Sequence, residues 1–127
     1  MIRQILYIDK LFLLNSKGNF FKIMQIKTII RENKDVVILS GELVGVDSLQ
    51  LSKTLAQYKT SECNEIIIDL RDVKYMDSNC FGSLIYSKIL LERNNKKVVL
   101  SAPKDDLNRI FRDCTFDQIF ETIEAYE

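Results

Sequence analysis

The sequence of 127 residues contains no histidine. Histidine is the commonest general base and the commonest metal ligand in proteins, so hydrolytic triads and zinc sites are disfavoured. We therefore expect no metal and no cofactor. Proline is nearly absent too. The chain has a single proline and therefore no proline-rich linker that would separate two domains. A chain of this length can bury one core, and we expect one compact α/β domain.

An excess of charge of one sign is also missing, since 18 basic and 18 acidic side chains cancel. This balance argues against general binding of nucleic acid and against attraction to an anionic membrane surface. No apolar run approaches the roughly 20 residues of a membrane span. Arg3, Asp9 and Lys10 interrupt the apolar N-terminal stretch, which therefore lacks the pattern of a signal peptide. We expect a cytoplasmic protein with no membrane insertion and no direct contact with nucleic acid.

Cysteines are few and unpaired in their spacing. Cys63, Cys80 and Cys114 are an odd number, and they form no C-x-x-C motif. Disulfide frameworks and metal sites need closer or paired spacing. The cysteines therefore favour a reducing, intracellular setting.

The rest of the chain is organised around residues 65–91. An apolar, β-branched run over residues 66–70 predicts a strand that is covered on both faces. Asp77, Ser78 and Asn79 are three favoured capping residues in a row. They predict a helix that runs to about Asn94, and its expected apolar face consists of Phe81, Leu84, Ile85 and Ile89. A helix start beyond the carboxyl end of a central strand often carries recognition or chemistry, so we place the functional site at Asp77 and Ser78.

Other elements flank this unit. Two strands over residues 26–31 and 35–39 are joined by a polar hairpin. Asp47 and Ser48 can cap the helix that follows, and Gln50 lies three residues after Asp47, as in a capping box. A strand over residues 98–100 precedes another helix, which begins near Asp105, and a short strand or helical turn ends the chain. This order predicts a mixed, mostly parallel β-sheet flanked by helices and opened by an antiparallel hairpin.

Residues 1–23 form an N-terminal extension of uncertain structure, and residues 24–127 form the domain. The extension is compatible with a short helix followed by an edge strand, or with a hairpin that pairs residues 11–14 with residues 20–23. It either packs on the domain or serves self-association, and a disordered leader is the alternative.

Several motifs together resemble one family. They are Gly41-Glu42-Leu43, Ile68-Asp69-Leu70 with Val73, Met76-Asp77-Ser78 before a helix that carries Gly82, and the late apolar positions Leu107, Ile110 and Phe111. Over about residues 25–124 this pattern resembles the STAS domain, which is shared by bacterial anti-sigma factor antagonists and the cytoplasmic tails of sulphate transporters. The resemblance implies a STAS-like mixed sheet and a regulatory protein that is not an enzyme.

The resemblance also implies a site and partners. Antagonists of this family bind a serine-kinase anti-sigma factor, which phosphorylates the serine after the aspartate, and a phosphatase reverses the mark. Carried over by position, the phosphoacceptor is Ser78. The partner-binding residues are then Asp77, Ser78, Asn79, Cys80 and Phe81. Asn79 and Cys80 replace the small hydroxyl or alanine and the glycine that are usual there, and Val44 replaces a usual aspartate.

Other interpretations stay open at this point. Ser78 can simply be the helix N-cap, worth ~1 kcal/mol. The protein can be an adaptor subunit of a transporter or stress-signalling complex in which Ser78 is never modified. Cys80, at a helix N-terminus where a thiol pKa is usually lowered, can serve a thiol-dependent enzyme or a redox sensor. We expect Cys80 to be accessible but dispensable. The sequence specifies no oligomeric state.

Overall fold

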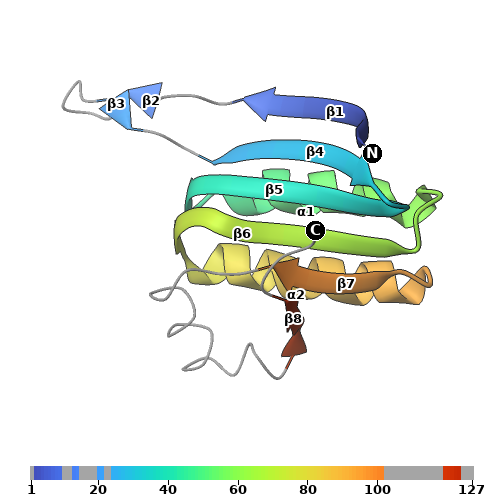
Figure 1. Cartoon of the computed structure of the whole chain (residues 1–127). Helices are drawn as coiled ribbons and strands as arrows, with labels where there is room; N and C mark the ends of the chain where they lie inside the picture. The colour runs from blue at the N-terminus through green and yellow to red at the C-terminus, as the bar shows by residue number, and fades with distance from the viewer. Residues whose placement is uncertain (1, 10–12, 15–19, 22–23, 102–118, 124–127) are drawn as a thin grey trace.

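The computed structural model describes residues 2–9, 13–14, 20–21, 24–101 and 119–123, and its main feature is a six-stranded mixed sheet (Figure 1). In spatial order the strands are β1 (Ile2–Asp9), β4 (Gln25–Arg31), β5 (Lys34–Leu43), β6 (Glu65–Met76), β7 (Lys97–Ser101) and β8 (Glu121–Ile123). β4 lies antiparallel to both β1 and β5, whereas β5, β6, β7 and β8 follow one another in parallel. The mixed, mostly parallel sheet expected from the sequence is confirmed.

Two helices lie side by side on one face of this sheet (Figure 1). They are α1 (Asp47–Ala56), which continues into the 3-10 turn η1 (Gln57–Thr60), and α2 (Ser78–Arg93). The main core lies between these helices and the sheet. Its fully buried members include Leu39, Leu43, Leu51, Leu55, Ile66, Ile68, Leu70 and Leu84. Among the described residues, no helix is long and apolar enough to cross a membrane.

The hairpin that opens the parallel part is built as predicted. Glu32 and Asn33 connect β4 and β5, and both have positive φ angles, 51° and 63°. A two-residue turn of this kind matches the twist of the strands that it joins. The central strand is also confirmed as covered on both faces, because Ile67 and its neighbour Ile68 are buried in separate clusters. The helix that follows ends at Arg93, as the sequence predicted.

β6 is longer than expected, and this length shapes the functional end of the molecule. The sequence predicted a strand that ends at Leu70, but β6 continues to Met76. Its pairing with β5 shifts register twice, between Ile38 and Ser40 and between Gly41 and Glu42. Such irregularities bend and twist a strand. Met76 lies opposite Leu43, so β5 and β6 end side by side. The segments that lead from these strands to the two helices therefore start at the same place.

The N-terminal part adds a strand to the sheet. β1 is an edge strand on β4, not a helix, and its pairing shows one register shift between Ile2 and Ile5. The alternative hairpin is present as β2 (Leu13–Leu14) paired with β3 (Phe20–Phe21). Of the two structures expected near the C-terminus, the strand is present, because β8 pairs in parallel with β7. The helix expected from Asp105 and the core position of Cys114 lie outside the described residues.

Candidate functional site

The candidate site lies where β5 and β6 end. The loop of residues 44–46 leaves β5 toward α1, and Asp77 leads from β6 into α2. The backbone N–H of Asp77 donates to the carbonyl of Leu43 at 3.0 Å, which joins the two exits. We call residues 44–47 and 77–81 together the carboxyl-end site. The sequence predicted its second half, and the structure adds the first.

Asp77 is the residue that ties the site together. It is the N-cap of α2 with an extended backbone, and its Oδ1 accepts a hydrogen bond from the N–H of Cys80 at 3.0 Å. Its Oδ2 accepts from the N–H of Gly45, on the other loop, at 2.7 Å. The Gly45 contact, followed by the Cys80 contact, holds the pKa of Asp77 below its ordinary value despite partial desolvation. The carboxylate is therefore ionised and already committed to two backbone donors.

Asp47 holds the same loop from the other side. Its side chain is buried, with 3% of the residue exposed, and Oδ2 accepts from the N–H of Val44 at 3.0 Å. The predicted capping role of Asp47 is wrong, because Val46 is the N-cap position of α1 and makes no side-chain cap. Asp47 is the first helical residue and reaches back along the chain. Gly45 has a φ angle of +57°, which favours glycine. Two carboxylates thus fix a three-residue loop.

Ser78 is exposed at the first position of α2. It is not the N-cap, so the interpretation of Ser78 as the capping residue is wrong. The reason is the neighbouring aspartate: a carboxylate is the stronger acceptor for the first-turn N–H groups, and Asp77 takes that role. Asn79 is exposed as well. The serine hydroxyl therefore faces solvent beside a carboxylate that is held in place.

Cys80 and Phe81 lie beneath this surface. Cys80 is 0% exposed and Phe81 only 7%. Burial, with the Asp77 carboxylate next to it, raises the pKa of the Cys80 thiol to about 12. The expectations of an accessible Cys80 with a lowered pKa are both wrong, because desolvation outweighs the helix N-terminus here. Asp77, Ser78 and Asn79 form the accessible part of the predicted set, whereas Cys80 and Phe81 support it from the core.

Exposed apolar side chains lie on the loop of residues 44–46 and on the two helices, and the sequence analysis did not predict them. Val46 on the loop is 72% exposed, Leu49 on α1 is 65% exposed and Tyr86 on α2 is 60% exposed. Tyr86 follows Ser78 at a spacing of two helical turns, so both lie on one face of α2. α1 and α2 are also linked, because the hydroxyl of Ser83 donates to the carbonyl of Ser48 at 2.9 Å. Surfaces of this kind favour contact with another protein.

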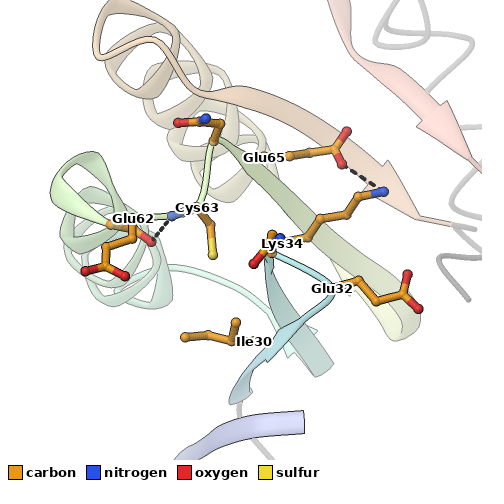
Figure 2. Close-up of a pocket in the computed structure, with 9 residues that line it drawn as sticks. Ile30, Glu32, Lys34, Glu62, Cys63 and Glu65 are labelled. Atoms are coloured by element: carbon orange, nitrogen blue, oxygen red, sulfur yellow. Dashed lines mark hydrogen bonds and ion pairs between the residues drawn. The ribbon is translucent and has the colours of Figure 1, made fainter. Parts of the chain in front are cut away.

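A pocket of about 650 Å³ lies at the opposite end of the sheet, between the β4–β5 hairpin and the segment that enters β6 (Figure 2). We call it the amino-end pocket. Cys63 points toward Ile30 across it, and Lys34 pairs with Glu65 at 3.0 Å on its wall. Burial, and next the charge of Asp35, raise the pKa of Cys63. The raised pKa leaves less of the reactive thiolate at neutral pH, which makes Cys63 a weaker nucleophile.

Comparison with known proteins agrees with this geometry. The model of the STAS domain family matches residues 25–127. The chain belongs to the STAS domain family. The chain is also similar to three solved structures, and each of these matches covers 80% of the present chain. An anti-sigma factor antagonist from Mycobacterium paratuberculosis is 18% identical, with a TM-score of 0.71 and 86% of that chain covered.

Two further neighbours are forms of one protein. The unphosphorylated form of the anti-sigma factor antagonist SpoIIAA is 17% identical, with a TM-score of 0.61 and 89% of that chain covered. The phosphorylated form of SpoIIAA, a Bacillus cell fate determinant, is 18% identical, with a TM-score of 0.62 and 92% covered. At these identities the likeness establishes the STAS fold.

Proposed function

We propose that this protein is an anti-sigma factor antagonist that binds a serine-kinase anti-sigma factor in the cytoplasm and is switched by phosphorylation of Ser78. In this proposal it regulates transcription through protein binding and is not an enzyme. A serine phosphatase restores the binding form. The observation that carries the proposal is the exposed hydroxyl of Ser78 at the start of α2, on a STAS fold.

The contacts of Asp77 support a phosphoacceptor next to it. A kinase needs a hydroxyl that it can reach on a surface of fixed shape, and Asp77 fixes that surface through Gly45 and Cys80. Because its carboxylate already accepts both hydrogen bonds, Asp77 is poorly placed to act as a base toward Ser78. We assign the proton transfer to the kinase and a positioning role to Asp77.

The same contacts explain why a phosphate would act as a switch. A phosphoryl group on Ser78 carries about −1.5 to −2 charge at neutral pH. Asp77 already occupies the first-turn N–H of Cys80, so that donor does not compensate the charge of the phosphate. The new dianion would stand beside an ionised carboxylate and close to the exposed Val46. A partner that packs against this surface would have to desolvate that charge, which typically costs several kcal/mol.

The neighbours provide the second line of support. Structures of SpoIIAA exist in an unphosphorylated and a phosphorylated form, and this chain is similar to both. An adaptor role without phosphorylation is the alternative, and it uses the same exposed surface. A thiol enzyme or redox sensor based on Cys80 is disfavoured, because its thiol is buried and its pKa is raised.

The test is capture of partners from the native lysate, combined with mass spectrometry of the protein itself. The proposal predicts a serine-kinase anti-sigma factor among the captured proteins and phosphate on Ser78. A matched control is Thr60→Ala, which removes an exposed hydroxyl near the amino-end pocket and should leave capture and phosphorylation unchanged. Capture of transporter or stress-complex subunits with Ser78 unmodified would favour the adaptor alternative instead.

A further inference from the structure

The outer edge of β1 is the longest strand edge without a described neighbour. β1 is the terminal strand of the sheet order, and none of the described strands pairs with its outer side. It has eight residues, whereas β8 at the opposite edge has three. The run from Gln4 to Ile8 contains no charged residue, no proline and no glycine. Charged residues, proline and β-bulges protect long edge strands from pairing with another chain. In β1 the register shift lies between Ile2 and Ile5, so the regular and uncharged part from Ile5 to Ile8 keeps an edge that can pair.

β1 is also an addition to the family domain. The STAS match begins at residue 25, so β1 lies outside it, and β4 would be the edge of the matched part. β1 extends the sheet by one strand on the side away from β6 and α2. β1 covers the edge of β4 and presents its own outer edge, and it does not cover the carboxyl-end site. Such a strand is suited to self-association.

We propose that β1 pairs antiparallel with β1 of a second copy, so that the two sheets become one continuous sheet about a two-fold axis near Leu6. Antiparallel pairing brings the end of one strand that carries Arg3 against the end of the other that carries Asp9. Parallel pairing would place like charges together, so the charges select the two-fold arrangement.

The register places residues of one copy opposite residues of the other in pairs whose numbers add to twelve. Leu6 faces Leu6 at the axis, and the remaining pairs are Ile5 with Tyr7, Gln4 with Ile8 and Arg3 with Asp9. The register shift of β1 on β4 lies between Ile2 and Ile5, and from Ile5 to Asp9 the pairing with β4 is regular.

Charge exchange in the full chain tests the proposal. Wild type should dimerise with rising concentration in analytical ultracentrifugation. Arg3→Asp and Asp9→Arg each turn both end pairs into like-charge contacts, and each should weaken the dimer about tenfold. The double exchange Arg3→Asp with Asp9→Arg should restore it. An equimolar mixture of the two single variants should form a heterodimer, because all its end pairs are opposite in charge.

Cross-linking gives an independent test of the register. Leu6→Cys should form a disulfide between copies, because residues at the axis face each other within disulfide range. Ile5→Cys and Tyr7→Cys are matched controls that should not, since each would lie roughly 7–8 Å from its own counterpart. Mixed together, these two controls should cross-link to each other. A protein that stays monomeric at all concentrations overturns the proposal. So does a dimer that ignores the charge exchange and the position of the cysteine, which includes pairing of β1 with a different protein.

Discussion

The two ends of the parallel sheet are both closed by a buried carboxylate, yet they present different surfaces. At the carboxyl end, Asp47 and Asp77 hold the loop of residues 44–46 through its N–H groups. At the amino end, buried Asp35 accepts a hydrogen bond from the hydroxyl of Ser61 at 2.5 Å. The carboxyl end leaves Ser78 and apolar side chains in solvent. The amino end instead turns Asp35 and Lys96 inward.

Lys96 makes the contrast sharper. This lysine is 8% exposed, and its ammonium group donates to the carbonyls of Ser61 and Cys63. Lys96 thereby holds the loop that leads into β6. The buried polar groups of the amino end therefore stabilise the fold, whereas those of the carboxyl end hold the surface that we propose for a partner. Each end can be disturbed separately, and the effects should differ in kind.

Lys96→Met should have the largest effect on stability. The substitution leaves the carbonyls of Ser61 and Cys63 buried without their donor, and we expect a loss of about 2–4 kcal/mol in the free energy of unfolding. Lys97→Met is the matched control, because Lys97 is exposed and its ion pairs are worth little. Urea denaturation measures both. Equal losses for the two variants would contradict a locking role for Lys96.

Cys80→Gly should destabilise the carboxyl end by roughly 2 kcal/mol. It removes a fully buried side chain and places a glycine in the first turn of α2. The family-like glycine is therefore not a neutral replacement in this chain. Cys80→Ala, which keeps helix propensity, should cost less, and thermal unfolding compares the two. In the native protein, a thiol reagent should modify Cys80 no faster than the protein unfolds, and rapid labelling would contradict the burial.

Asp77→Ala should cost about 1–2 kcal/mol, because it removes the acceptor for the N–H groups of both Cys80 and Gly45. Ser78→Ala should change stability by less than about 0.5 kcal/mol, since Ser78 is exposed and does not cap the helix. Denaturant unfolding of the pair decides which residue is the cap. A larger loss for Ser78→Ala than for Asp77→Ala would reverse the assignment.

The smallest expected effect is a pH dependence. The pKa of Asp77 is lowered in the folded protein, so its ionisation contributes stability above the ordinary carboxyl pKa, and this is lost as pH falls through the folded value. Wild type should therefore lose more stability than Asp77→Asn when the pH drops below about 4. Equal acid sensitivity of the two proteins, measured by chemical unfolding across this range, would show that the two hydrogen bonds add nothing.

Local chemistry was enough to predict most of the fold. The β-branched run before Asp69, the polar turn at Glu32 and Asn33 and the capping residues before Phe81 each placed an element correctly. The apolar face of α2 was predicted less well. Ile89 is 47% exposed, while the helix buries Cys80, Ser83 and Ser87. Small residues let α2 approach α1 closely. The spacing of apolar residues in the sequence does not predict such an approach.

The candidate site shows the same limit. Asp77 and Ser78 could be found from capping preference and family resemblance, because both depend on neighbours in the chain. The hydrogen bond between Gly45 and Asp77 spans 32 residues, and it forms at the ends of two strands whose pairing shifts register twice. The burial of Cys80 likewise depends on packing between elements. Contacts across the sequence, set by irregular pairing, are the part that local patterns do not encode.

Binding of the captured anti-sigma kinase to defined forms of Ser78 tests the central claim most directly. Isothermal titration would compare the unphosphorylated protein, the protein phosphorylated on Ser78, and Ser78→Ala. ATP is left out, so that the kinase cannot phosphorylate Ser78 during the titration. The account predicts that the unphosphorylated protein and Ser78→Ala bind alike. The phosphorylated form should bind on the order of a hundredfold more weakly, equivalent to ~3 kcal/mol. Equal affinity of all three forms would contradict the switch, whatever the stability of the individual variants.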